Sequence, residues 1–165
     1  MSAAKARPRV IGVIGGSVVG PDVEAIAEEV GAAIAEAGAV LVCGGRGGVM
    51  AAACRGARSR GGLTLGVLPG TDRAQANPWV DLPIVTGLGE ARNVIICRTA
   101  EVVVAIDGGY GTLSEIAFAL HFGTPVVGVG TWSVQPHGGG EDPIVRAGSA
   151  AEAVAMALDL AAARG

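Results

Sequence analysis

Short apolar runs alternate along the chain with longer segments of mixed polarity. The apolar runs are rich in β-branched residues and mostly continuous, which is typical of strands that are covered on both faces of a sheet. The segments between them repeat apolar positions at helical spacing; one has Pro21 near its first turn, and the last follows Ser149, a favoured helix cap. The pattern predicts strands at 10–14, 39–43, 63–68, 83–86, 100–106 and 125–129, and helices at 21–37, 48–59, 89–98, 113–122 and 149–163.

This alternation predicts the fold class, which is α/β. Strand–helix–strand units join parallel strands through right-handed crossovers. We expect residues 9–165 to form a single doubly wound, Rossmann-like domain with a mostly parallel sheet of six or so strands. Residues 1–8 are expected to form a disordered tail. The 165 residues are near the size of one domain, and no linker or internal repeat interrupts the pattern.

The composition narrows the classes of function. Only 3% of the residues are aromatic, whereas 28 are glycines, which suit tight turns and close packing of helices on a sheet. The formal net charge of -3 gives no electrostatic footprint for nucleic acid. Lys5 is the only lysine, which argues against pyridoxal phosphate and other chemistry that needs a buried Schiff-base lysine. The remaining basic residues are arginines, which suit bidentate recognition of anions.

Cysteines, histidines and apolar segments give no sign of a metal centre, a disulfide framework or a membrane anchor. Cys43, Cys54 and Cys97 are an odd number without CxxC spacing, so we expect reduced, buried thiols. His121 and His137 form no metal-ligand spacing with them, and no metal is expected. The start of the chain lacks the apolar core of a signal peptide, and no run reaches the roughly 18 apolar residues of a membrane span. We therefore expect a cytoplasmic protein without a membrane partner.

Three of the expected strand-to-helix turns are rich in glycine. They are Gly15-Gly16-Ser17 after the first strand, Gly44-Gly45-Arg46-Gly47-Gly48 after the second, and Gly108-Gly109-Tyr110-Gly111-Thr112 after the fifth. In a parallel sheet these turns share one edge, where ligands bind. Without Cβ atoms, their amide N–H groups can approach an anion closely. Tight packing is the alternative explanation, but three such turns at one edge favour a site for phosphate or another compact anion.

Side chains near these turns add candidate chemistry. Thr112 offers a hydroxyl donor or a simple N-cap at the start of a helix whose first N–H groups are unpaired and partly positive. Glu115 could hold a sugar hydroxyl, assist proton transfer or complete a capping box with Thr112. Arg92 could bind phosphate or Glu115, or be a solvated helix residue, whereas Arg46 has few packing options between glycines. The spacing matches neither GxGxxG nor GxxxxGKS/T, so neither an ordinary dinucleotide site nor a P-loop is predicted.

Three motifs together carry a family resemblance. GGRGGVM at 44–50, GLGEARN at 87–93 and GGYGTLSE at 108–115 resemble the LOG-like, or lysine-decarboxylase-like, Rossmann superfamily, in the same order and over most of the chain. The resemblance implies that the phosphate turn lies at 108–112. It also implies a homodimer or homotetramer. The old label of lysine decarboxylase is not supported, because the chain has no internal lysine to carry that cofactor.

Two branches of this superfamily are relevant. The cytokinin-activating enzymes are phosphoribohydrolases that cut the N-glycosidic bond of nucleoside 5′-monophosphates, and their motif PGGxGTxxE with an upstream arginine implies catalytic roles for Glu115 and Arg92. Asp107 replaces the proline of that motif, and Asn93 stands where those enzymes typically carry lysine. The ARN sequence, the TLSE ending and the compact length are more similar to a shorter branch that includes molybdenum cofactor carrier proteins. Those proteins bind a pterin with a terminal phosphate and store it or pass it on.

Three functions are compatible with this resemblance. We favour a protein that binds and carries a phosphorylated, nucleotide-like ligand, such as a molybdopterin-type cofactor or a nucleotide monophosphate, with no further cofactor required. A phosphoribohydrolase and a nucleotide sensor whose ligand alters assembly are the alternatives. The ring of the ligand could stack on Trp79 in the loop at 69–80 or on Trp132 in the loop at 131–142, and simple packing of these side chains is the alternative. The expected ligand-binding residues are Gly15, Gly16, Ser17, Gly44, Gly45, Arg46, Asn93, Gly108, Gly109, Tyr110, Gly111 and Thr112.

Overall fold

The computed structural model describes residues 6–165 and contains one sheet of seven strands. The order across the sheet is β4-β3-β2-β1-β5-β6-β7, and every neighbouring pair is parallel. The doubly wound α/β architecture predicted from the sequence is thus confirmed. Residues 1–5 of the expected tail lie outside the described residues. The strands are β1 (Val10–Gly15), β2 (Val40–Cys43), β3 (Thr64–Leu68), β4 (Leu82–Val85), β5 (Val102–Ile106), β6 (Val126–Val129) and β7 (Val145–Arg146).

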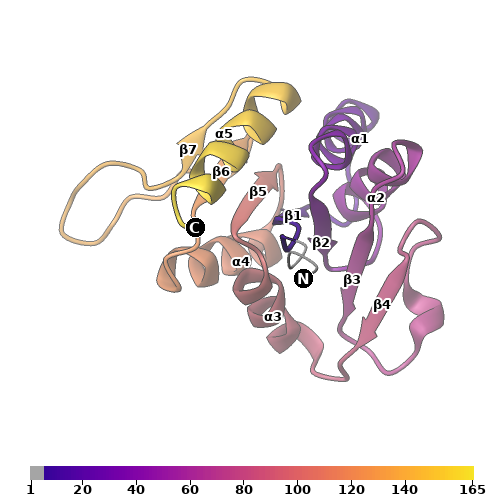
Figure 1. Cartoon of the computed structure of the whole chain (residues 1–165). Helices are drawn as coiled ribbons and strands as arrows, with labels where there is room; N and C mark the ends of the chain where they lie inside the picture. The colour runs from indigo at the N-terminus through magenta and orange to yellow at the C-terminus, as the bar shows by residue number, and fades with distance from the viewer. Residues whose placement is uncertain (1–5) are drawn as a thin grey trace, which may run out of the picture.

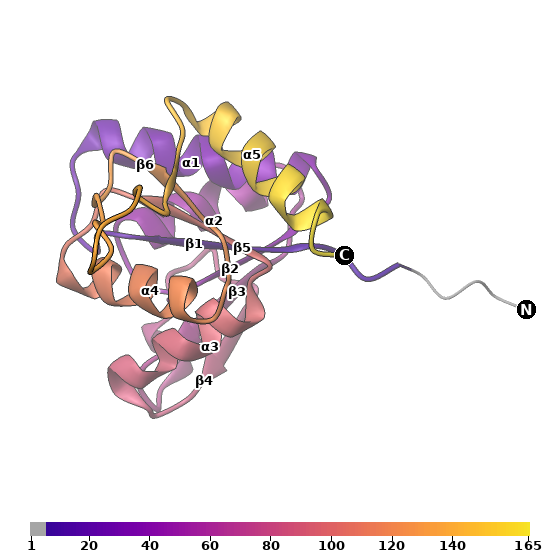
Figure 2. The same cartoon turned by 90° about the vertical axis from the view of Figure 1, so that its left-hand side faces the viewer.

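Helices cover both faces of this sheet. The helices α1 (Pro21–Glu36), α2 (Val49–Ser59) and α5 (Ala150–Ala162) lie on one face (Figure 1). The helices α3 (Asn93–Thr99) and α4 (Tyr110–His121) lie on the other, as the turned view shows (Figure 2). Two 3-10 helices, η1 (Arg73–Gln75) and η2 (Gly89–Arg92), precede β4 and α3.

The strand β5 shows why its sequence is apolar at every position. Val102, Val104 and Ile106 belong to the core on the α1, α2 and α5 face. Val103 and Ala105 belong to the core on the α3 and α4 face. Successive side chains of a strand point to opposite faces, so a strand covered on both sides needs no polar position. The same arrangement leaves the ends of the strands as the place for polar chemistry.

Two glycines set the contact between α1 and α2. A Cβ atom on Gly31 would overlap the carbonyl of Ala53, and one on Gly56 would overlap the carbonyl of Glu28. Each helix therefore presents a glycine to the backbone of the other. Part of the high glycine content serves this close packing rather than ligand binding.

Some boundaries differ from the prediction at 113–122 and beyond 130. The helix expected to begin at 113 begins at Tyr110 instead, with Gly109 as its N-cap and no side-chain cap. Thr112 is therefore the third helical residue, so the alternatives of an N-cap at Thr112 and of a capping box with Glu115 are wrong. By contrast, Ser149 caps α5 as predicted, because its side chain accepts a hydrogen bond from the amide of Glu152.

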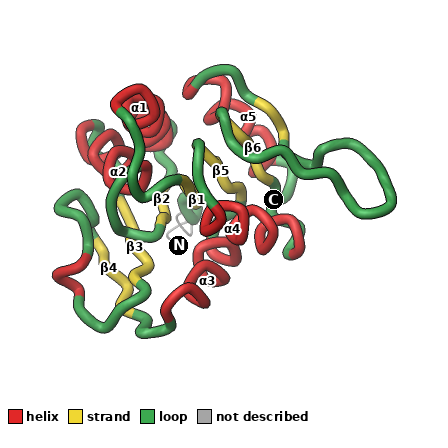
Figure 3. Tube along the Cα trace, turned by 180° about the vertical axis from the view of Figure 1, so that it is seen from behind, coloured by secondary structure: helices red, strands yellow, loops and turns green. Residues whose placement is uncertain are grey.

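The strand β7 was missed because it has two residues, both exposed, and lacks an apolar pattern. It follows a long loop between β6 and β7 that extends away from the helices (Figure 3). In the part of the chain that the structure describes, no helix is long and apolar enough to cross a membrane.

Candidate functional site

A pocket of about 500 Å³ opens at the carboxyl edge of the sheet. The turns after β1, β2 and β5 all contribute to its wall, together with the segment that joins η2 to α3. The three glycine-rich turns therefore meet at one pocket, as the sequence predicts. The lining residues are Gly15, Gly16, Ser17, Val18, Arg46, Gly47, Met50, Glu90, Arg92, Asn93, Gly109, Gly111, Thr112 and Glu115.

Most of the residues predicted to bind ligand line this pocket, but four of them do not: Gly44, Gly45, Gly108 and Tyr110. The pocket also includes residues that sequence reasoning missed. Gly47 lies in the glycine-rich turn after β2 but was not among the residues predicted to bind ligand. Its place in that turn was the signal that could have identified it. Met50 and Glu90 are part of the motifs GGRGGVM and GLGEARN, but an apolar side chain or an acid there is equally expected on a structural surface. Val18 lies in none of the three motifs.

Gly44 makes room for a side chain instead of exposing its amide. A Cβ atom at this position would overlap the guanidinium Nη1 of Arg92 and lie 2.7 Å from the Sδ of Met50. The guanidinium of Arg92 therefore packs directly against the turn after β2. Gly44 itself is buried and seats Arg92, whereas a contact between Gly44 and ligand stays a prediction.

Arg92 is buried, and its guanidinium makes no hydrogen bond within residues 6–165. It is 6% exposed, and its Nε and Nη1 atoms have no hydrogen-bond partner. Among residues 6–165 it forms no ion pair, including with Glu115. A buried charge without a partner is costly, and this one lies at the wall of the pocket. The alternative of a solvated helix arginine is wrong.

Asn93 continues this polar floor. It is 3% exposed, and its Nδ2 lies 3.4 Å from the Ser114 hydroxyl to which it donates. Its Oδ1 atom is buried without a hydrogen-bond partner. The side chain thus retains one unused acceptor, beside the unused donors of Arg92.

Glu115 lies on the first turns of α4 and is 8% exposed. Burial raises the pKa of its carboxyl group to about 7, an effect that the positive charge of Arg92 opposes and the negative charge of Glu90 reinforces. The carboxyl group can therefore hold or release a proton near neutral pH. This is the property that a general acid or base requires.

The start of α4 presents backbone groups to the pocket. The N-cap residue Gly109 and the second helical residue Gly111 both line it, and a Cβ atom at either position would meet nothing within 4 Å. The first N–H groups of a helix lack intrahelical acceptors and carry partial positive charge. Trp132 fixes the turn from the other side, because its Nε1 donates to the carbonyl of Gly109 at 3.0 Å.

Asp107 opens this turn in an unusual backbone conformation. Its φ of 51° is the only positive value among the described residues other than glycine. Its amide donates to the carbonyl of Val129 at 3.3 Å, and its own carbonyl accepts from the Thr131 hydroxyl at 2.6 Å. Proline has a φ near −65° and no N–H group, so it fits neither feature. The departure from the motif proline is therefore conformational as well as electrostatic.

The three thiols are buried, as expected. The Sγ atoms of Cys43 and Cys54 are 3.5 Å apart, and Cys97 donates to the carbonyl of Glu115 at 3.2 Å. Burial raises the pKa of Cys97 to about 12, so this thiol stays protonated. Among residues 6–165, no group of three or more His, Cys, Asp or Glu side chains could hold a metal ion.

Residues 8–157 match the family model of the SLOG cluster4 family. The chain belongs to the SLOG cluster4 family. The match covers all three turns and every element from β1 to most of α5. The LOG-like resemblance read from GGRGGVM, GLGEARN and GGYGTLSE is thereby confirmed.

Proteins similar to this SLOG protein include members of both branches considered above. A molybdenum cofactor binding protein of Rippkaea orientalis is 34% identical with a TM-score of 0.83, over 93% of this chain and 98% of that protein. The molybdenum cofactor carrier protein of Chlamydomonas reinhardtii is 38% identical with a TM-score of 0.82, over 94% and 99% of the two chains. A cytokinin riboside 5′-monophosphate phosphoribohydrolase of Mycobacterium tuberculosis is 38% identical over 65% of this chain and 62% of that enzyme.

Proposed function

We propose that this protein binds a phosphorylated, nucleotide-like ligand in the pocket and carries it, with a molybdopterin-type cofactor as the preferred class. The observation that carries the proposal is Arg92, a buried guanidinium with two unpartnered nitrogens in the wall of an open pocket. An anionic group of the ligand would supply the missing acceptor and offset the cost of burial.

The phosphate would lie at the start of α4. There the amides of Gly111 and Thr112, with the Thr112 hydroxyl, supply donors that helices leave free. Gly109 and Gly111 leave the approach open because no side chain covers it. Gly15, Gly16 and Ser17 form the neighbouring wall. The volume of about 500 Å³ suits a small organic ligand rather than a bare anion.

The choice of a carrier function rests on similarity as well as geometry. Structures similar over nearly their whole length include a molybdenum cofactor binding protein and a molybdenum cofactor carrier protein. A terminal phosphate accepts hydrogen bonds. The pocket would offer it amide, hydroxyl and guanidinium donors. When bound, the cofactor supplies its own metal chemistry; the residues here would only hold and orient it.

A phosphoribohydrolase is the second candidate, and Glu115 is the observation that favours it. Its carboxyl group has a pKa of about 7 and shares the pocket with Arg92. Water would attack C1′ of the ribose 5-phosphate unit as the N-glycosidic bond breaks, and the base would leave with a proton. Glu115 would hold the ribose or move that proton, and Arg92 would stabilise the developing charge.

Two assays on the purified protein separate these candidates. Molybdopterin binding is measured by equilibrium titration, and free base is measured after incubation with AMP and with an N6-modified AMP. A carrier binds molybdopterin tightly and releases no base. An enzyme releases base, and Glu115→Gln abolishes that release. Glu29→Gln, at an exposed acid outside the pocket, is the matched control and should change neither result.

Binding to the pocket is tested in the same experiments by Arg92→Ala. Loss of ligand affinity in this variant, with the overall helix content unchanged by circular dichroism, supports the site. Unchanged affinity for both molybdopterin and AMP would contradict it. If a nucleotide binds without turnover but changes the oligomer size on a sizing column, the sensor function replaces the carrier function.

A further inference from the structure

Asn77, in the loop between η1 and β4, holds the turn after β2 at two successive carbonyl groups. Its backbone amide donates to the carbonyl of Gly45 at 2.8 Å. Its side-chain Nδ2 donates to the carbonyl of Arg46 at 2.9 Å. One residue thereby fixes the orientation of two adjacent peptide groups in the wall of the pocket.

Peptide planarity gives this contact a consequence for ligand binding. In a trans peptide group the C=O and the following N–H point in opposite directions. With the carbonyls of Gly45 and Arg46 turned toward Asn77, the amides of Arg46 and Gly47 point away from it. Both residues line the pocket, and Gly47 has only backbone atoms with which to do so.

Neither of these amides donates a hydrogen bond to another group in residues 6–165. Successive free N–H groups in a turn form a concave site that binds anions. The guanidinium of Arg92 packs against Gly44 in the same turn, and its Nε and Nη1 are also without partners. The free donors of the turn and of Arg92 therefore lie at one place.

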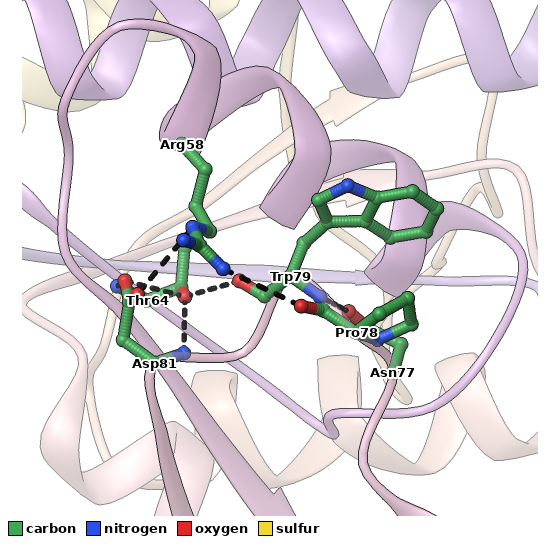
Figure 4. Close-up of polar contacts among 6 residues, drawn as sticks. All are labelled: Arg58, Thr64, Asn77, Pro78, Trp79 and Asp81. Carbon is green, nitrogen blue, oxygen red and sulfur yellow. Dashed lines mark hydrogen bonds and ion pairs between the residues drawn. The ribbon is translucent and has the colours of Figure 1, made fainter.

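The loop that carries Asn77 is itself anchored by polar contacts (Figure 4). The Oδ1 of Asn77 accepts from the amide of Trp79 at 3.0 Å. The Thr64 hydroxyl donates to the carbonyl of Trp79 at 2.6 Å, and Asp81 accepts from the amide of Thr64 at 3.0 Å. Arg58 forms an ion pair with Asp81, with 3.5 Å between Nε of Arg58 and Oδ1 of Asp81. These bonds tie the loop to β3 and α2, so Asn77 has a fixed platform.

We propose that Asn77 is the positioning residue of an oxyanion subsite formed by the amides of Arg46 and Gly47 beside Arg92. The subsite takes phosphate oxygens of the ligand, and this inference rests on the proposed function. Asn77 does not touch the ligand; it acts through the turn. The chain thus binds the oxyanion with groups at the start of α4 and with a second set at the turn after β2.

The test is an NMR titration of isotope-labelled protein with inorganic phosphate. Binding moves the amide resonances of residues that donate to the anion. We expect Arg46 and Gly47 to shift along with Gly111 and Thr112 in the wild-type protein. Asn77→Ala and Asn77→Asp should weaken phosphate binding measured at Arg46 and Gly47 by about three- to tenfold, the usual effect of one hydrogen bond.

The two variants isolate the Nδ2 contact. Both keep the backbone bond to Gly45, and Asn77→Asp also keeps an acceptor for the amide of Trp79. Asn77→Asp also adds a negative charge, so its loss is measured again at high ionic strength, where that charge is screened. A loss that is common to both variants under this condition belongs to the bond from Nδ2 to Arg46. Thr64→Val is the matched control, because it removes a buried hydroxyl that anchors the same loop without touching Asn77. It should lower stability but leave the phosphate shifts unchanged, because Asp81 still anchors the loop through the amide of Thr64 and through Arg58.

The outcomes separate this inference from the proposed function. Shifts at Gly111 and Thr112 without shifts at Arg46 and Gly47 would overturn the subsite and leave the proposed function standing. Equal phosphate affinity at Arg46 and Gly47 in wild type and both Asn77 variants would overturn the role of Asn77, as would an equal loss in Thr64→Val. Absence of shifts at every turn would overturn both the proposed function and the subsite.

Discussion

The turns after β2 and β5 are both rich in glycine, but their glycines have different surroundings in the structure. In the turn after β5, Gly109 and Gly111 leave open space before the first amides of α4. In the turn after β2, Gly44 and Gly45 are buried, and Gly44 leaves room for the guanidinium of Arg92. Glycine next to a strand therefore marks either an exposed backbone or a cavity that another side chain fills. Only the surroundings in space distinguish the two.

In the proposed anion site, the two turns have different roles. The turn after β5 contributes backbone donors at a helix start, whereas the turn after β2 accommodates a cation delivered by η2. The guanidinium of Arg92 occupies the space that a side chain at Gly44 would fill. Variants at the two turns should therefore fail in different ways.

The largest expected effect is at Asp107, which opens the turn after β5. Asp107→Pro should lower the free energy of unfolding by about 3 kcal/mol or more, because it loses the amide bond to Val129 and cannot adopt a positive φ. Asp107→Gly should be neutral or raise it by about 1 kcal/mol, since glycine adopts this conformation without strain. Urea unfolding measures both variants. A stable Asp107→Pro would show that the turn can take the backbone of the enzyme motif.

The next effect concerns Glu115 and depends on pH. Its pKa of about 7 in the folded protein lies above the usual 4.5, so the folded state binds the proton more tightly than the unfolded state. The stability from the protonated group is present below about pH 4.5 and is lost as pH rises through about 7. Relative to Glu115→Gln, the wild type should lose up to about 3 kcal/mol over this range.

Unfolding curves of the two proteins across this pH range measure the effect. Glu29→Gln, at an exposed acid on α1, serves as the control and should follow the wild type. A constant difference between Glu115→Gln and the wild type at all pH values would show that the carboxyl group titrates normally.

A smaller loss of stability is expected at Gly44, where the turn after β2 seats Arg92. Gly44→Ala should cost about 1 to 3 kcal/mol, because the new methyl group overlaps the guanidinium and crowds Met50. It should also displace Arg92 and lower phosphate affinity. Unfolding and phosphate titration together measure this. Wild-type values in both would contradict the role assigned to Gly44.

The smallest effect on stability is expected for a substitution at Gly109, which should instead lower the affinity for phosphate. Gly109→Val should change the free energy of unfolding by at most about 1 kcal/mol, since its Cβ atom meets nothing and its backbone is extended. Its side chain should nevertheless block the anion and lower phosphate affinity at least about tenfold. Ala117→Val, on the exposed face of α4, adds the same side chain outside the pocket and should retain affinity.

The sequence alone could predict the fold and the meeting of the turns, because continuous apolar strands and their order determine both. It could also place Arg92 and Glu115 at the same edge. It could not assign Gly44 to packing, because that depends on a side chain 48 positions away in the chain, nor start α4 at Tyr110, because no side chain caps that helix. The contacts of Asn77 could not be predicted for the same reason, because its partners lie 31 and 32 residues earlier, in the turn after β2.

The most direct test of the central claim is a crystal structure of the protein grown with AMP. The account predicts phosphate density at the start of α4, within hydrogen-bond distance of the amides of Gly111 and Thr112, with the guanidinium of Arg92 turned toward the ligand. Phosphate bound away from these three residues, while the pocket holds only water, would contradict it.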